Sequence, residues 1–138
     1  MQDFRKLAVW QRSHQLALDV YARTASFPKE ELYGLTSQLR RASTSVPANI
    51  AEGCGRGGGA DLARFLQIAM GSASELEYHL LLARDLKMLP AEHYAALQDG
   101  VVEVKRMLSG LIGRVRGKNG RPAVADRTRT TDNWAADD

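Results

Sequence analysis

The sequence of 138 residues is 44% hydrophobic and 25% charged, so it fits one globular domain with a single core and is too short for two. The sequence excludes a membrane-spanning helix, which needs roughly 20 consecutive apolar residues. Its charged first residues do not form a secretory signal, so we expect a cytoplasmic protein. The lone cysteine, Cys54, excludes an intramolecular disulfide, while the net charge of +3 is compatible with RNA or DNA as a partner.

The first predicted helix covers residues 7–21, where apolar side chains recur three and four residues apart and therefore share one side of an α-helix. Phe27-Pro28 ends it, because the residue before a proline is pushed out of the α region. The side chains predicted to face the core from this helix are Leu7, Trp10, His14, Ala17 and Tyr21, with Leu18 beside them.

The second predicted helix covers residues 32–50 and is closed by the glycines between Gly53 and Gly59, because glycine adopts left-handed helix ends without strain. Pro47 lies inside this helix and removes a backbone donor, so we expect a kink there. The predicted core stripe consists of Leu32, Leu35, Leu39, Ala42, Val46 and Ile50.

Polar residues of this segment keep the same spacing beside the apolar stripe and predict a hydrogen-bond network at the edge of the core. They are Gln38, Ser45, Asn49 and Glu52. Glu52 has two candidate partners, Arg56 and Arg41 of an adjoining subunit, and a solvated helix face is the alternative to the network.

The third predicted helix covers residues 62–86 and is the longest, and the fourth covers residues 94–115 after Pro90, which suits a helix start. Small residues in the middle of the third helix, Gly71, Ser72 and Ser74, permit the close approach of another helix, from the same chain or from another subunit.

The segment beyond Arg116 has no repeating apolar pattern and cannot bury enough surface to offset its ordering entropy. We therefore predict a disordered tail over residues 117–138. Because short connections force neighbouring helices to run antiparallel, the predicted fold class is all-α, an antiparallel up-down-up-down four-helix bundle over residues 4–116.

Three chemical signals are weak. Gly53-Cys54-Gly55-Arg56-Gly57-Gly58 matches G-x-G-x-x-G, but that fingerprint requires a strand before the glycines, so a helix–helix hairpin is favoured over a dinucleotide site. Metal sites in bundles need paired Glu-x-x-His motifs, and only Glu75 and His79 share a face. Cys54 has no histidine nearby in the sequence to act as a base. We predict no catalytic residue, no metal site and no cofactor.

The strongest chemical signal is a block of basic residues at the end of the fourth helix and the start of the tail. No acidic residue lies between Lys105 and Arg121, and clustered Lys and Arg bind phosphate backbones through counterion release. The alternative is that these cations only complement the helix dipole and maintain solubility. The candidate nucleic-acid-binding residues are Lys105, Arg106, Arg114, Arg116, Lys118 and Arg121.

An ordered series of short motifs extends from Phe4 to about Val115. It consists of Phe4-Arg5-Lys6-Leu7, Val9-Trp10-Gln11, Phe27-Pro28, Tyr33-Gly34-Leu35-Thr36-Ser37-Gln38-Leu39-Arg40-Arg41, Ser45-Val46-Pro47-Ala48-Asn49-Ile50-Ala51-Glu52-Gly53, Gly55-Arg56, Phe65-Leu66, Ile68-Ala69, Gly71-Ser72 and Glu75-Leu76-Glu77. This series resembles the four-helix-bundle proteins encoded by intervening sequences of bacterial 23S ribosomal RNA genes, the S23 family.

The resemblance implies a bundle that assembles into a ring-like homo-oligomer, a pentamer, without enzymatic activity. The family is also similar to the accessory variability determinant of diversity-generating retroelements, a basic bundle that binds a reverse transcriptase and nucleic acid, and this likeness is one of fold and charge only. Signature positions with an implied structural or interface role are Tyr33, Gln38, Arg40, Arg41, Asn49, Glu52, Gly53 and Arg56.

We therefore expect a non-enzymatic oligomeric scaffold whose partners are copies of itself and RNA or DNA. One alternative is a protein-interaction module that presents the loop over residues 52–59 to a protein partner. The other is a small-molecule or metal-dependent enzyme.

Overall fold

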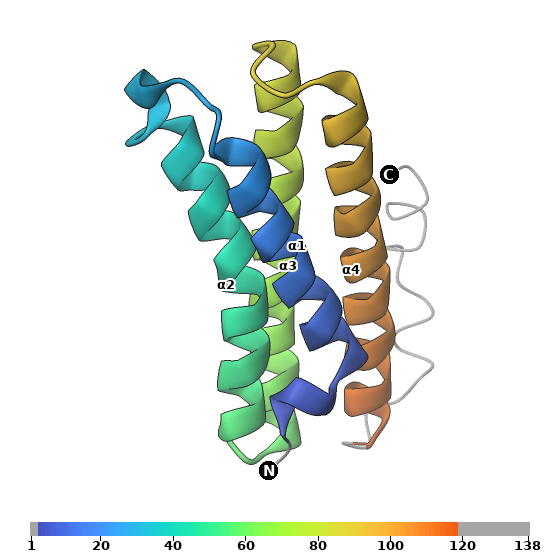
Figure 1. Cartoon of the computed structure of the whole chain (residues 1–138). Helices are drawn as coiled ribbons and strands as arrows, with labels where there is room; N and C mark the ends of the chain where they lie inside the picture. The colour runs from blue at the N-terminus through green and yellow to red at the C-terminus, as the bar shows by residue number, and fades with distance from the viewer. Residues whose placement is uncertain (1–2, 119–138) are drawn as a thin grey trace.

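A computed structural model describes residues 3–118 of the protein. Its main elements are four α-helices, α1 (Ala8–Thr24), α2 (Leu35–Gly55), α3 (Gly59–Asp85) and α4 (Ala91–Lys118), and two short 3-10 helices, η1 (Phe4–Lys6) and η2 (Lys29–Glu31). Each α-helix runs opposite to the one before it (Figure 1). The described part of the chain therefore confirms the predicted all-α, up-down-up-down bundle. Arg121 and most of the predicted tail lie outside the described residues, and the domain boundary near residue 116 stays a prediction.

The core is a column of aliphatic side chains contributed by all four α-helices. Its largest fully buried members are Leu39, Ile50, Leu66, Leu76, Leu80, Leu108, Val20, Val46, Val101 and Val104. Together with the buried Ala42, Ala69 and Ala73, these residues recur three and four positions apart on α2, α3 and α4, which is the spacing from which the helices were predicted. None of the helices in residues 3–118 combines the length and the apolar character needed to cross a membrane.

The predicted core face of α1 is only partly right. Ala17 is buried, and Leu7 and Trp10 pack half-buried against the core. Val9, Leu16 and Val20 are buried, whereas Leu18 and Tyr21 are 50% and 44% exposed, and His14 is also exposed. The helix carries two neighbouring apolar stripes, and the one with the compact aliphatic side chains faces the core. The other, aromatic stripe faces outward along α2.

Helix α2 continues through Pro47, so the proline does not end the helix. The proline side chain is buried. The last turn of α2 lies very close to α3, because a Cβ atom added to Gly53 would lie 2.9 Å from the Cβ of Phe65. Gly57 has a φ of 83°, a left-handed conformation that glycine adopts without strain, and it turns the chain into α3. The predicted helix–helix hairpin is confirmed.

Candidate functional site

The basic residues of α4 face several directions. At about 100° per residue, Lys105 and Arg116 share one side of the helix, while Arg106 and Arg114 point to other sides. Lys105 is committed to an ion pair, because its Nζ lies 2.8 Å from Oε1 of Glu77 on α3. Arg106 and Arg114 are exposed, Arg116 is half-buried, and none of these three forms an ion pair within residues 3–117.

The ion pair with Lys105 also affects the titration of Glu77. Partial burial by itself raises the pKa of this carboxyl, but hydrogen bonds from Lys105 and Gln98, together with the charge of Lys105, outweigh it and lower the pKa below its ordinary value. The Glu77 carboxylate accepts 2.8 Å and 2.9 Å hydrogen bonds from these two side chains of α4. Lys105 therefore has a structural role in joining α3 to α4.

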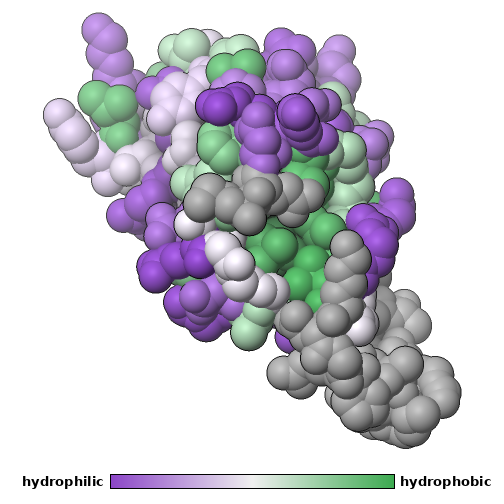
Figure 2. All heavy atoms as spheres, turned by 90° about the horizontal axis from the view of Figure 1, so that it is seen from below, coloured by the Kyte–Doolittle hydropathy of each residue, from purple (hydrophilic) through white to green (hydrophobic). Residues whose placement is uncertain are grey.

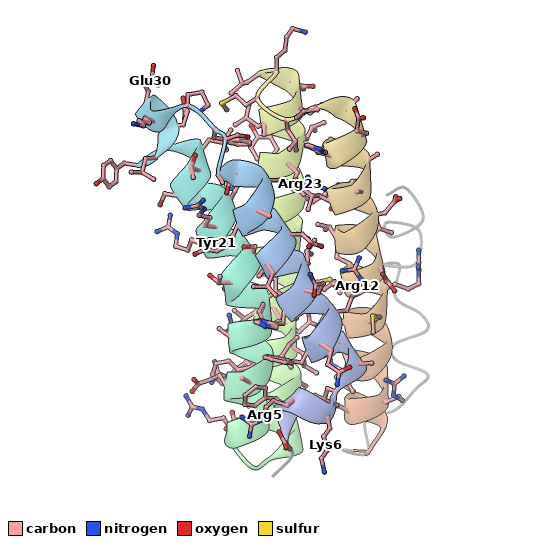
Figure 3. All side chains as sticks on the ribbon, viewed as in Figure 1. Arg5, Lys6, Arg12, Tyr21, Arg23 and Glu30 are labelled. Carbon is pink, nitrogen blue, oxygen red and sulfur yellow. The ribbon has the colours of Figure 1, made fainter. Side chains whose placement is uncertain are left out.

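The fold gathers further cations at the end of the bundle where α4 terminates. Arg5 and Lys6 of η1 lie at this end (Figure 3), about 110 positions in sequence before Arg116. Arg5 pairs with Asp3, whereas Lys6 has no ion pair within residues 3–117. We call Lys6, Arg114 and Arg116 the basic end. Sequence spacing missed Lys6, because only the packing of α1 against α4 places it there.

Figure 2 views the molecule from this end. Hydrophilic side chains form most of the visible surface around a small apolar area (Figure 2). Two further arginines are neutralised, since Arg56 at the end of α2 pairs with Glu52 and Arg64 near the start of α3 pairs with Asp61. The cations of the basic end are thus left as the charge available to an anion.

The signature residues divide into packed and exposed groups. Arg40 donates from Nε to Oγ1 of Thr24 at 2.9 Å and places its guanidinium 4.6 Å from the centre of the Tyr21 ring. Gly53 lies against Phe65, and Arg56 joins Glu52 to the face of the same ring. By contrast, the signature side chains that are exposed and form no hydrogen bond within the described part of the chain are Tyr33, Gln38 and Arg41.

The predicted polar network is smaller than expected. Ser45 of α2 and Ser72 of α3 share a 2.8 Å hydrogen bond between their hydroxyl oxygens, and Asn49 donates to Ser45 Oγ at 3.0 Å. This contact confirms that a small residue at position 72 permits close approach within the chain. Gln38 and Glu52 are exposed and lie outside the network, because the α2–α3 contact leaves them on the solvent side.

The weak chemical signals gain no support from the geometry. Cys54 is buried, and burial raises the pKa of its thiol, so the reactive thiolate is disfavoured. Glu75 is exposed and His79 is half-buried. No group of three or more His, Cys, Asp or Glu residues within the described range could hold a metal ion.

A groove between α1 and α2 is the main feature that the sequence pattern missed. Its α1 wall is formed by the outward stripe of Trp10, His14, Leu18 and Tyr21, with Phe4 at one end, and its floor by small residues of α2 such as Ala48. The Trp10 ring stacks on His14 at 4.9 Å and meets Phe4 edge-on at 5.0 Å. The two apolar stripes of α1 were the signal for this α1–α2 groove.

Comparisons with known proteins agree with the fold. A family model described as 23S rRNA-intervening sequence protein matches residues 5–110. The structure is also similar to that of a protein with unknown function from the S23 ribosomal protein family of Bacteroides thetaiotaomicron, with 26% sequence identity and a TM-score of 0.69. That similarity covers 76% of this chain and 98% of the other. A comparison with curated proteins gave no match.

Proposed function

This chain belongs to the family of 23S rRNA-intervening sequence proteins, and we propose that it acts as a non-enzymatic scaffold that assembles with copies of itself and binds the phosphate backbone of RNA or DNA. The ring-like pentamer implied by the S23 resemblance and a cytoplasmic location are parts of this proposal. The likeness to the accessory determinant of diversity-generating retroelements stays a prediction.

The basic end carries the nucleic-acid half of the proposal. Figure 3 shows Lys6 at the end of the bundle where α4 terminates, and Arg114 and Arg116 belong to the last two turns of α4. None of the three has a carboxylate partner within residues 3–117. Cations on such a surface release the counterions condensed on a phosphate backbone, and this gives affinity without base recognition. The exposed Arg106 extends the cationic surface along α4.

A salt titration tests this binding. The affinity of the purified chain for a fluorescent duplex DNA and a single-stranded RNA of arbitrary sequence is measured by anisotropy at increasing NaCl. We expect log K to fall linearly with log salt, and the slope to decrease by about 0.9 for each phosphate contact removed when Arg106, Arg114 and Arg116 are changed to Ala.

The matched control removes the same charge elsewhere, through Arg23→Ala, Lys29→Ala and Lys87→Asn. Asn is chosen for Lys87 because that residue has a φ of 62°, which Asn tolerates. The control should keep the affinity and the salt slope of the wild type. Equal losses in both triple variants, or undetectable binding by the wild type at low salt, would refute nucleic-acid binding through this surface.

The second candidate function is a protein-interaction module without nucleic-acid binding. The α1–α2 groove favours it, because exposed aromatic side chains are enriched where proteins contact one another. A protein complex that survives nuclease treatment, and that is insensitive to the loss of Arg106, Arg114 and Arg116, would support this function over the first.

A further inference from the structure

The α1–α2 groove has an apolar wall with an arginine near each end, and Asp3 neutralises one of the two, Arg5. Leu18 and Tyr21 on this wall are 50% and 44% exposed. At one end the Arg5 guanidinium lies 5.1 Å from the centre of the Phe4 ring. At the other, Arg41 is exposed on α2, one turn before Thr44, which lines the groove. The volume of about 360 Å³ gives room for one or two large side chains rather than a whole domain.

The connection between α1 and α2 presents an exposed apolar turn next to an exposed carboxylate, where the groove presents a hollow and an arginine. Leu32 and Tyr33, which we call the Leu32–Tyr33 turn, follow η2 and are 46% and 93% exposed. The carboxylate of Glu31 accepts a hydrogen bond from the Leu35 backbone and is committed to the start of α2, while Glu30 is exposed. An apolar projection therefore stands beside a negative charge.

The projection and the groove lie at different places on the molecule. Figure 3 shows Glu30 at the end of the bundle opposite Arg5, with Tyr21 on the side of the bundle between them. Because Tyr33 is 93% exposed, it makes almost no contact within its own chain and does not occupy its own groove. The two surfaces are complementary in polarity and charge but can meet only between molecules.

We propose that the Leu32–Tyr33 turn of one copy of this chain inserts into the α1–α2 groove of a second copy, with Glu30 of the first facing Arg41 of the second. This inference rests on the self-assembly in the proposed function and assigns the contact surfaces to it. The contact is heterologous, because different patches of the two copies meet, and repeating it generates a ring or a filament.

Because the contact is heterologous, it can be tested by mixing two variants. Tyr33→Ala removes the projection and keeps the groove, whereas Leu18→Asp blocks the groove and keeps the projection. Each variant alone should lose assembly in sedimentation velocity and remain a folded monomer by circular dichroism, since both side chains are exposed. Mixed in equal amounts, the two variants should form a dimer of one copy of each, because only one intact projection and one intact groove are present.

Two matched controls change exposed residues elsewhere. Tyr78→Ala and Ile68→Asp replace side chains on α3 that are 57% and 41% exposed, and both should assemble as the wild type does. Wild-type assembly by the Tyr33→Ala or Leu18→Asp variant, or a mixture that stays monomeric, overturns the assigned contact and leaves self-assembly standing. A monomeric wild type at all concentrations removes self-assembly from the proposed function as well.

A charge exchange tests the pairing of Glu30 with Arg41. Glu30→Arg and Arg41→Glu should each weaken assembly, because each places like charges across the contact. The double variant restores opposite charges and should regain assembly. Failure of the double variant to assemble better than both single variants overturns this pairing.

Discussion

At the scale of single residues, Gly53 fixes how closely α2 approaches α3. An added Cβ would lie 2.9 Å from the Phe65 Cβ and 3.0 Å from Cδ1 of Leu62, and neither backbone can move without disturbing the core. Gly71, in the middle of α3, has no atom within 4 Å of such a Cβ. Gly53 is therefore required by helix packing, whereas a substitution of Gly71 affects only the helix propensity.

We predict that Gly53→Ala lowers the free energy of unfolding by about 1–3 kcal/mol through overpacking. Gly71→Ala should raise it by about 0.5–1 kcal/mol, because alanine loses less backbone entropy in a helix. Urea denaturation of both variants measures these changes. Stabilisation by Gly53→Ala would show that the α2–α3 contact can relax.

The Glu77 carboxyl makes the α3–α4 contact sensitive to acid. Its pKa is lowered in the folded state, so its contribution to stability is fully present above the ordinary glutamate pKa of about 4.3 and is lost as the pH falls through the lower folded value. The protein should therefore lose this contribution only in acid.

We predict that Glu77→Gln is less stable than the wild type at neutral pH, and that the difference shrinks as the pH falls below about 4. Urea midpoints at several pH values measure it. Glu75→Gln, on the exposed side of the same helix, is the control. Its stability should differ from that of the wild type by the same amount at every pH. A gap between the wild type and Glu77→Gln that stays constant with pH would assign the acid sensitivity to other groups.

At the scale of the helix, α1 shows how two apolar stripes divide their roles. Leu16 is 2% exposed and Leu18 is 50% exposed, although the two leucines are two positions apart. Arg12 anchors this orientation, since its Nε lies 2.7 Å from Oε1 of Glu103 on α4. The close approach of α1 to α4 also depends on Gly100, where an added Cβ would lie 3.0 Å from Cδ1 of Leu16.

We predict that Leu16→Ala costs about 2–5 kcal/mol of unfolding free energy, because it leaves a cavity in the core. Leu18→Ala should change the stability of the isolated bundle by no more than about 0.5 kcal/mol, because Leu18 lies on the surface. Thermal or urea unfolding at low protein concentration compares the two. Equal costs would mean that both stripes of α1 are buried in the monomer.

At the scale of the whole molecule, the two proposed surfaces adjoin at η1, where Phe4 lines the groove and Lys6 belongs to the basic end, but they share no residue. The basic end lies where α4 terminates, and the α1–α2 groove runs along the side of the bundle (Figure 3). A nucleic acid at the end and a neighbouring copy at the side would therefore not compete for the same residues. The charge variants and the mixing experiment can accordingly be interpreted independently.

The sequence by itself determined the helices, their approximate ends and most of the core faces of α2, α3 and α4, because on these helices a single apolar stripe leaves one way to bury it. The assignment of Leu32 to the core was wrong, because this residue precedes α2 and is 46% exposed. The glycine run likewise predicted the α2–α3 hairpin. Only the tertiary structure decided which stripe of α1 is buried, which is why His14, Leu18 and Tyr21 were assigned to the core.

The candidate site was predictable only in part for the same reason. Clustering in sequence identified Lys105 and Arg116, but the Glu77 partner of Lys105 is on another helix, and Lys6 reaches the basic end through the packing of α1. Local periodicity is set by neighbours along the chain, whereas the choice between two apolar faces and the grouping of charges depend on helices that pack from distant parts of the sequence.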